Sequence, residues 1–326
     1  MLEADADSMV GRIKAISNLR ECAGSELVIE AIIEDLSIKQ ALFTEIEGIV
    51  SEDTILATNT SSLSVASISA ALKNKQRFLG IHFFNPAPLM PLVEIIPGYI
   101  TSEAVLTKVV HLVKDWGKVG VVAKDTPGFI VNRLARPFYG EALRIAEEGI
   151  ANFETIDHAM KSLGGFRMGP FELMDFIGHD VNYRVTETVW QQMFYDARYR
   201  PSLIQKRLFE SGLYGKKSGR GYYLYENDNR LAQEVNPDFN LQSGIFERVM
   251  VMLFNEALEA LYLGIAAAED LDKAMMKGVN YPQGLISWAQ TWGHAKVLSK
   301  LEELHFEYGD DRYRPSVMLR KMVRGA

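Results

Sequence analysis

The chain has 326 residues, of which 48% are hydrophobic and 24% charged, a composition typical of an ordinary globular protein of two or three domains. Its formal net charge of −7 argues against a nucleic-acid partner, because such surfaces normally carry an excess of basic residues. The single cysteine, Cys22, excludes an intrachain disulfide and favours a reducing cytoplasm, and no apolar run reaches the length of a membrane span.

The first 125 residues alternate short β-type runs with helical patterns. Strands are predicted at 26–33, 54–57, 78–82 and 92–96, and a helix is predicted at 38–49. This alternation is typical of a mostly parallel sheet covered by helices. We therefore predict that residues 1–125 form an α/β domain.

From about residue 126 the pattern changes to long amphipathic helices. Within the first of them, 133–148, Pro137 predicts a kink and Gly149 is a plausible C-terminal cap. A polar stretch at 226–240 is suited to a linker. We expect one all-α domain at 126–228 and a second at 229–326.

The two helical segments repeat one another. Glu141-Ala-Leu143 recurs as Glu256-Ala-Leu258, at an offset of 115 residues. The same offset relates several further pairs, among them Gly149 and Gly264, Asp157 and Asp272, Gly169 and Gly284, and Gly178 and Gly293. The segment 198–202 returns as 312–316 at an offset of 114. Two copies of one helical domain should pack together around a pseudo-two-fold axis, with helices 133–148 and 247–263 at the interface. Asn132 corresponds to Glu247, so only the first copy is expected to supply a site residue.

His82 and Glu94 are the most promising pair for chemistry. A histidine whose second ring nitrogen is held by a carboxylate can accept a proton from a substrate hydroxyl near neutral pH. Taken alone, a histidine beside aromatic residues is more often a core or surface residue. Polar clusters at 58–62 and 126–133, each at the end of a predicted element, indicate instead a shared crevice at the carboxyl ends of the strands. The six histidines show no metal-ligand spacing, so no metal site is predicted.

Four blocks carry a family resemblance: 57–62 (ATNTSS), 82–86 (HFFNP), 92–94 (LVE) and 127–133 (PGFIVNR). In this order and spacing they resemble the signature blocks of the bacterial and mitochondrial 3-hydroxyacyl-CoA dehydrogenases. The duplicated helical domain is similar to that of the longer bacterial subgroup, which includes 3-hydroxybutyryl-CoA dehydrogenases and 3-hydroxyadipyl-CoA dehydrogenases of phenylacetate catabolism. The resemblance implies an NAD-dependent oxidoreductase of fatty acid metabolism that acts on an acyl-CoA substrate, and it leaves a homo-oligomer open.

The same resemblance implies roles for four residues. His82 would remove the proton of the substrate's 3-hydroxyl while hydride leaves for the nicotinamide ring, and Glu94 would orient the imidazole. Ser61 and Asn132 would hydrogen-bond the reacting oxygen or the thioester carbonyl.

For the cofactor, the resemblance assigns Glu34 and Lys39 to the nicotinamide ribose, Asn85 and Ser61 to the nicotinamide, and Lys217 to a loop that returns to the cofactor. From the residues alone, Glu34 and Lys39 could equally be a solvated helix start. Arg167 could pair with a distal carboxylate of the acyl chain, although an arginine in such a loop is more often a surface contact.

One feature departs from the family. Its nucleotide-binding domains begin with a strand, a G-x-G-x-x-G turn and a helix that hold the pyrophosphate. The 326 residues contain no such turn, so we expect an N-terminally truncated Rossmann-like domain, with NAD affinity in doubt. Two functions remain open: a shortened 3-hydroxyacyl-CoA dehydrogenase, or a catalytically inactive relative that binds acyl-CoA or serves in oligomerisation.

Overall fold

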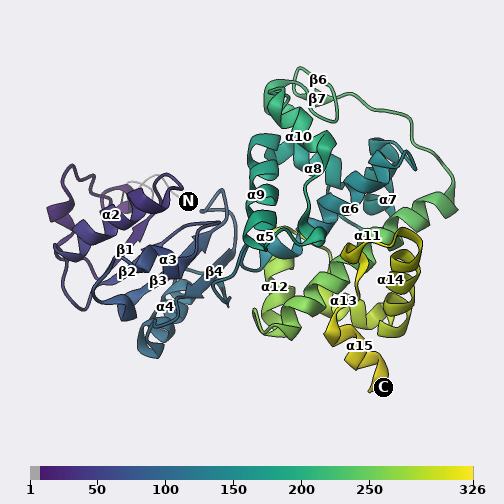
Figure 1. Cartoon of the computed structure of the whole chain (residues 1–326). Coiled ribbons are helices and arrows are strands. Elements are labelled where there is room, and N and C mark those ends of the chain that lie inside the picture. The colour runs from purple at the N-terminus through teal and green to yellow at the C-terminus, as the bar shows by residue number, and fades with distance from the viewer. Residues whose placement is uncertain (1–7, 326) are drawn as a thin grey trace.

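The computed structural model describes residues 8–325 and places a sheet domain beside a larger helical domain (Figure 1). Within these residues one sheet has five strands, in the order β1-β2-β3-β4-β5. Their bounds are β1 (Leu27–Glu30), β2 (Ile55–Thr58), β3 (Phe78–Phe83), β4 (Leu92–Pro97) and β5 (Val119–Val122). Neighbours pair in parallel except β3 and β4, which are antiparallel. The prediction of a mostly parallel sheet followed by helices is confirmed.

Two details of the strand prediction are wrong. The first strand ends at Glu30 and not at 33, because the backbone N–H of Ile32 donates to the Glu30 carboxylate and is withdrawn from the sheet. Strand β5 was not predicted. It contains Gly120, where a Cβ would lie 3.2 Å from side-chain carbons of both Ile95 and Val113, so only glycine allows this strand to pack so closely.

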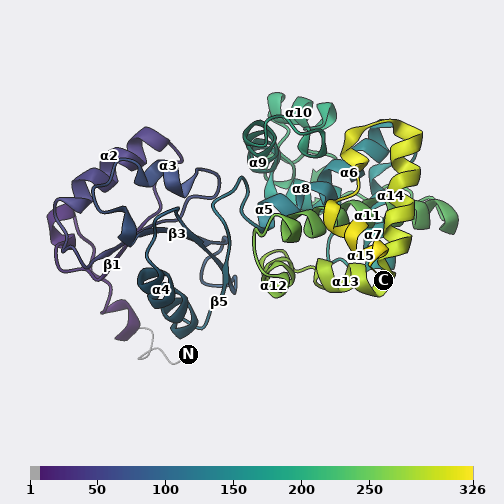
Figure 2. The ribbon, with the colours of Figure 1, turned by 60° about the horizontal axis from the view of Figure 1, so that its bottom comes forward.

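Helices cover both faces of the sheet (Figure 2). On one face lie α2 (Leu36–Glu47) and α3 (Val65–Ser69), which bury Phe43 and Ile68. On the other lies α4 (Glu103–Asp115), which buries Val109 and Val113 against the sheet. Each of these helices begins at a serine or aspartate whose side chain accepts a backbone N–H of the first turn.

The helical domain begins with α5 (Val131–Leu134), α6 (Arg136–Glu147), α7 (Phe153–Gly164), α8 (Pro170–Ile177), α9 (His179–Gln192) and α10 (Leu203–Glu210). A small hairpin follows, β6 (Tyr225–Glu226) and β7 (Asn229–Arg230). The remaining helices are α11 (Phe239–Tyr262), α12 (Ala268–Gly278), α13 (Leu285–Trp292), α14 (His294–Tyr308) and α15 (Val317–Arg324).

The predicted kink at Pro137 is present as a break. Helix α5 ends at Leu134, and α6 starts at Arg136 with Pro137 in its first turn, where a missing N–H costs nothing. Gly149 lies just after α6 with a φ of 71°, as expected for a C-terminal cap. The matching helix α11 is unbroken and starts at Phe239, earlier than the expected 247, because Asp238 caps its first turn.

The internal repeat appears as repeated local structure. The carboxylate of Asp157 accepts the backbone N–H groups of Phe171 and Glu172 at the start of α8. Asp272 accepts those of Ile286 and Ser287 at the start of α13. Each carboxylate lies against a glycine of its own copy, Gly169 and Gly284 respectively, where a Cβ would come within 2.4 Å of the aspartate. Aspartate and glycine therefore recur together, because any side chain at the glycine position would overlap the aspartate.

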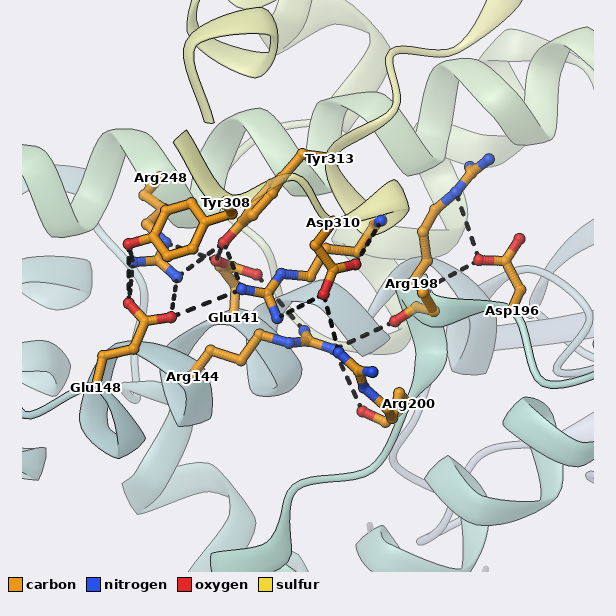
Figure 3. Close-up of polar contacts among 12 residues, drawn as sticks. Glu141, Arg144, Glu148, Asp196, Arg198, Arg200, Arg248, Tyr308, Asp310 and Tyr313 are labelled. Atoms are coloured by element: carbon orange, nitrogen blue, oxygen red, sulfur yellow. Dashed lines mark hydrogen bonds and ion pairs between the residues drawn. The ribbon is translucent and has the colours of Figure 1, made fainter. Parts of the chain in front are cut away.

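The two copies pack against one another along α6 and α11, as predicted. Figure 3 shows part of the contact, where the carboxylate of Glu141 on α6 lies among residues of the second copy. It accepts from Arg248 Nε at 2.6 Å and from the hydroxyl of Tyr313 at 2.5 Å. Glu141 is fully buried, so these donors compensate for the loss of its hydration.

The reciprocal contact is made by Glu256 on α11. Its carboxylate accepts from Arg133 Nε at 2.6 Å and from the hydroxyl of Tyr199 at 2.7 Å. These residues occupy the repeat positions of the first contact with the copies exchanged. The helical domain is therefore held by a pseudo-symmetric, isologous interface within one chain.

Candidate active site

His82 and Glu94 are direct partners in the antiparallel pairing of β3 with β4. Residues opposite one another in such a pair point to the same face of the sheet. The imidazole Nδ1 lies 2.7 Å from Glu94 Oε2, and both side chains are buried. Because a carboxylate can only accept, the proton of the neutral imidazole sits on Nδ1 and leaves Nε2 free to accept another.

The second oxygen of Glu94 is held by the start of α5. It accepts the backbone N–H groups of Ile130 at 3.0 Å and Val131 at 2.9 Å. The turn that aims these donors contains Gly128 with a φ of 75°, where a Cβ would lie 2.9 Å from the backbone nitrogen of Arg133. Three hydrogen bonds thus fix the orientation of Glu94, and through it the imidazole ring.

Aromatic rings enclose the imidazole. The ring centroid of His82 lies 4.6 Å from that of Phe84 and 6.0 Å from that of Phe129. Phe129 is buried, with a φ of 46° that bulky residues rarely adopt. The strained turn therefore places an apolar ring beside the imidazole of His82, and the backbone N–H of the next residue donates to Glu94.

Ser61 lies on the loop after β2, and Glu34 anchors this loop. Glu34 Oε1 accepts the backbone N–H groups of Ser61 and Ser62, each at 3.0 Å, and the hydroxyl of Thr60 at 2.6 Å. Burial alone would raise the pKa of Glu34, but the hydrogen bonds from Thr60 and Ser62 and the charge of Lys39 lower it overall. Glu34 therefore holds the Ser61 loop in place as an ionised carboxylate.

Lys39 is 1% exposed and lies behind this carboxylate. Its ammonium group pairs with Glu30 at 2.5 Å and with Glu34 at 3.3 Å. The opposite oxygen of Glu30 accepts from the hydroxyl of Thr58 in β2. The structure thus gives Lys39 an internal position from which it supports Glu34.

Asn132 is half-buried on α5, directly after the amides that bind Glu94. The Ser61 loop reaches the same helical domain, because Gln192 at the end of α9 donates to the Ser62 carbonyl at 3.0 Å. Ser62, Gln192 and Asp125 help to line a crevice between the sheet and helical domains. The lining of this crevice includes Ser62 but not Ser61, Asn132 or His82. Ser61 precedes Ser62 on the loop after β2, and Asn132 lies on α5.

Asp125 and Gln192 were not singled out from the sequence. Asp125 accepts the backbone N–H groups of Val65 and Ala66 and so ties the link between the domains to the start of α3. Its position just before a Thr-Pro-Gly turn was the available signal. Gln192 carries no local sequence signal, because its role depends on where α9 ends.

Asn85 and Lys217, the other two predicted cofactor residues, are not among the residues that line this crevice. Asn85 is exposed on the loop after β3. Lys217 forms an ion pair with Asp180 in the first turn of α9, whereas the Ser62 contact is made by Gln192 in the last turn. Twelve residues of helix separate these positions, or roughly 18 Å at 1.5 Å per residue. The contact of Lys217 on α9 is therefore separated, along the helix, from the contact that α9 makes with Ser62.

Residues 8–325 contain neither a cluster suited to a metal ion nor a helix suited to a membrane. No group of three or more His, Cys, Asp or Glu side chains is arranged to hold a metal ion. No helix in the same range combines the length and the apolar character needed to cross a membrane.

Comparisons with known proteins match both parts of the chain. Residues 1–126 match the family described as 3-hydroxyacyl-CoA dehydrogenase, NAD binding domain. The C-terminal domain of the same family matches residues 128–225 and 245–325. The match to the C-terminal domain thus covers both helical copies.

Individual relatives agree with the family matches. A 3-hydroxyadipyl-CoA dehydrogenase of Escherichia coli is 36% identical and covers 95% of this chain and 83% of its own. The crystal structure of a 3-hydroxybutyryl-CoA dehydrogenase from Escherichia coli superposes with a TM-score of 0.93 at 34% identity, covering 99% of this chain and 86% of that one. An (S)-3-hydroxybutyryl-CoA dehydrogenase from Ralstonia eutropha has a TM-score of 0.67 at 39% identity, over 70% of this chain and 80% of that one.

Proposed function

This chain belongs to the 3-hydroxyacyl-CoA dehydrogenase family, and we propose that it oxidises (3S)-3-hydroxyacyl-CoA to 3-oxoacyl-CoA. The observation that carries the proposal is the buried His82–Glu94 pair, with Nδ1 held at 2.7 Å and Nε2 left free. Nε2 accepts the proton of the 3-hydroxyl as the carbon–oxygen double bond forms, and Glu94 stabilises the charge that the imidazole acquires. NAD⁺, when bound, takes the hydride from the same carbon.

Ser61 and Asn132 position the substrate in this proposal. Ser61 follows β2 and Asn132 lies on α5, so the sheet domain and the helical domain each supply one of the two side chains that hold the reacting carbon in place. Hydrogen bonds from these side chains to the 3-oxygen or the thioester carbonyl stabilise the charge that develops there. The relatives named for 3-hydroxybutyryl-CoA and 3-hydroxyadipyl-CoA support a short acyl chain.

The residues present fit the nicotinamide end of NAD. The carboxyl ends of β1 and β2 form the edge where nucleotides bind in open α/β sheets. There the polar Glu34 and Ser61 lie close to Ile32 and Ile33, whose apolar side chains are 44% and 67% exposed. Such a mixture of polar groups and uncovered apolar surface suits a ribose and a flat ring.

The pyrophosphate of NAD lacks its usual binding turn in this sequence. The amides that would hold it belong to a G-x-G-x-x-G turn, which the 326 residues do not contain. We therefore propose that the 326-residue polypeptide binds NADH weakly, with a dissociation constant well above micromolar. Calorimetric titration measures this directly, and micromolar binding would show that other residues replace the turn. A cytoplasmic location also remains a proposal, supported by the single Cys22.

The decisive experiment for the function is His82→Gln. With 3-hydroxybutyryl-CoA and excess NAD⁺, NADH formation should fall roughly 10²- to 10⁴-fold, the usual loss when a general base is removed. Acyl-CoA binding should be retained. His111→Gln is the matched control, because His111 is exposed on α4 and should leave turnover unchanged.

Two outcomes would contradict the proposal. Turnover within about threefold of the parent in His82→Gln would leave His82 without a catalytic role. Acyl-CoA binding with no turnover by the parent, even at saturating NAD⁺, would favour a catalytically inactive acyl-CoA-binding protein.

A further inference from the structure

Lys124 connects the link between the two domains to the second helical copy. The link, residues 123–130, leads from β5 to α5. The backbone N–H of Lys124 donates to the Ile265 carbonyl at 2.8 Å, and its ammonium group donates to the Leu263 carbonyl at 2.8 Å. Leu263 caps the C-terminus of α11, where the helix dipole also favours a cation. Two hydrogen bonds from one residue thus hold the link to the end of α11.

The repeat shows how the second copy accommodates this lysine. Gly264, which follows Leu263, and its repeat equivalent Gly149 have positive φ values of 61° and 71°. A Cβ at Gly264 would lie 3.1 Å from the ammonium nitrogen of Lys124. A Cβ at Gly149 would have no neighbour within 4 Å among residues 8–325, apart from the residues adjacent to it in the chain. The same helix end thus occurs in both copies, and in the second it leaves space for the lysine of the link.

Helix α12 of the second copy packs against β4 and β5. At its end, a Cβ on Gly278 would lie 2.6 Å from Leu92 Cδ2 and 3.0 Å from Val131 Cγ2, so glycine is needed for this close approach. Leu163 occupies the matching position of the first copy. Leu92 precedes Glu94 by two residues on β4, and the backbone N–H of Val131 donates to Glu94. The second copy therefore contacts both elements that hold Glu94.

Asp125, the next residue of the link, contacts the sheet domain. Its carboxylate accepts from the hydroxyl of Ser64 at 2.9 Å and from two backbone N–H groups at the start of α3, at 3.0 and 2.7 Å. Ser64 ends the loop that carries Ser61. Further along the link, the backbone N–H of Ile130 donates to Glu94. One short segment thus contacts the second copy, the Ser61 loop and Glu94.

An open cleft of about 670 Å³ lies beside Lys124. Its walls are residues 97–99 and 122–126 on one side, and residues 264–267 with Asp270 of the second copy on the other. Because the cleft leaves room for the two domains to move, their relative orientation at this edge depends on the contacts that cross it. The hydrogen bonds of Lys124 are such contacts.

We propose that Lys124 is a positioning residue for the oxidation. By binding the end of α11, it holds the sheet domain at the angle at which His82 and Asn132 act on one substrate. The second helical copy thereby contributes to the reaction through the link and not through a side chain at the reacting atoms. This rests on the proposed function, in which His82 and Asn132 come from different domains. Reacting groups displaced by about 1 Å can lose on the order of 10²-fold in rate.

The first measurement is turnover of 3-hydroxybutyryl-CoA by the full chain at saturating NAD⁺. Lys124→Glu places a carboxylate at the C-terminus of α11, which repels it, and kcat should fall roughly tenfold or more. Lys124→Met only removes the donor and should have a smaller effect. Lys124→Arg keeps a donor and should retain kcat within about threefold of the parent. Lys114→Glu is the matched control, because Lys114 lies exposed in the last turn of α4, within the sheet domain.

The second measurement reports the domain orientation without turnover. Spin labels on Cys22, the single cysteine of the chain, and on Glu302→Cys, at an exposed position of α14, give the distance between the domains by double electron–electron resonance. The distance distribution should be narrow in the parent and in Lys114→Glu, and broader or shifted in Lys124→Glu. An unchanged distribution in Lys124→Glu, or a changed one with the turnover of the parent, would refute the role of Lys124 and leave the proposed function intact. No turnover by the parent protein would overturn both.

Discussion

Glu256→Gln tests whether the reciprocal ion pairs hold the two helical copies together. Arg133 is 3% exposed, and Glu256 is its only ion-pair partner among residues 8–325. Burial alone would lower the pKa of Arg133, but the charge of Glu256 raises it. Glutamine preserves the shape and one acceptor oxygen, so the variant removes the negative charge and leaves the guanidinium buried and unpaired.

The size of the effect follows from that geometry. Breaking a buried ion pair by removing one partner typically costs about 3–5 kcal/mol. We expect the lower end, roughly 3 kcal/mol, because the glutamine oxygen can still accept from Arg133 or from Tyr199. For a body of about 200 residues this lowers Tm by roughly 6–12 °C. Urea unfolding followed by circular dichroism, together with calorimetry, measures both quantities.

The double variant Arg133→Met with Glu256→Gln provides the control. It removes the arginine that pairs with Glu256 alone, whereas Arg198, which also pairs with Glu256, keeps Asp196 and Glu259 as partners. The Tyr199 hydroxyl can still donate to the glutamine oxygen, so most of the lost stability should return. A Glu256→Gln protein within about 1 kcal/mol of the parent would refute the reasoning. So would a double variant less stable than the single one.

Two further predictions concern the same domain. Burial raises the pKa of Asp157 to about 7, against an ordinary value of 3.8, despite donors from Phe171, Tyr223 and Glu172. Because this pKa is higher in the folded state, the contribution of Asp157 to stability is full below about pH 4 and declines until about pH 7. Asp157→Asn should remove this decline, which amounts to a few kcal/mol of unfolding free energy in the parent protein. Urea titrations at several pH values measure it, and the same dependence of unfolding free energy on pH in both proteins would contradict the prediction. A fragment of residues 1–225 should dimerise or aggregate, because it exposes the face of α6 that α11 buries. Light scattering and calorimetry test this, and a monomeric fragment with unchanged Tm would show that the two copies fold independently.

The strands of the sheet and the His82–Glu94 pair could be predicted from the sequence because their signals are local. Short β-type runs separated by helical patterns located four of the five strands within a few residues. The antiparallel direction of β4 was not predicted, since a buried strand reads the same in either direction. That direction makes His82 and Glu94 register partners, so the hydrogen bond between them depends on topology as much as on residue type.

The surroundings of the site could not be read from the sequence. The amides that bind Glu94 become available only because Gly128 and Phe129 adopt positive φ values. Lys39 was assigned to the cofactor by resemblance and, from the residues alone, equally to a solvated helix start. Two carboxylates, from the end of β1 and the loop after it, instead hold it in the interior. Such positions depend on contacts between loops, which leave no periodic pattern.

The way in which the two helical copies differ indicates where the chemistry lies. Arg133 and Glu141 recur as Arg248 and Glu256 because each copy needs them to bind the other. Asn132 instead matches Glu247, which forms an ion pair with Lys296 on the second copy's own helices.

The same contrast holds one turn further on, where Arg136 matches the buried Val251. Both differences fall on the short segment that continues from the amides bound to Glu94. If the second copy had kept a site of its own, an asparagine and an arginine would be expected at its matching positions, in place of Glu247 and Val251. Because these positions hold a surface ion pair and an aliphatic core residue instead, the second copy contributes packing here, and the polar side chains beside Glu94 come from the first copy.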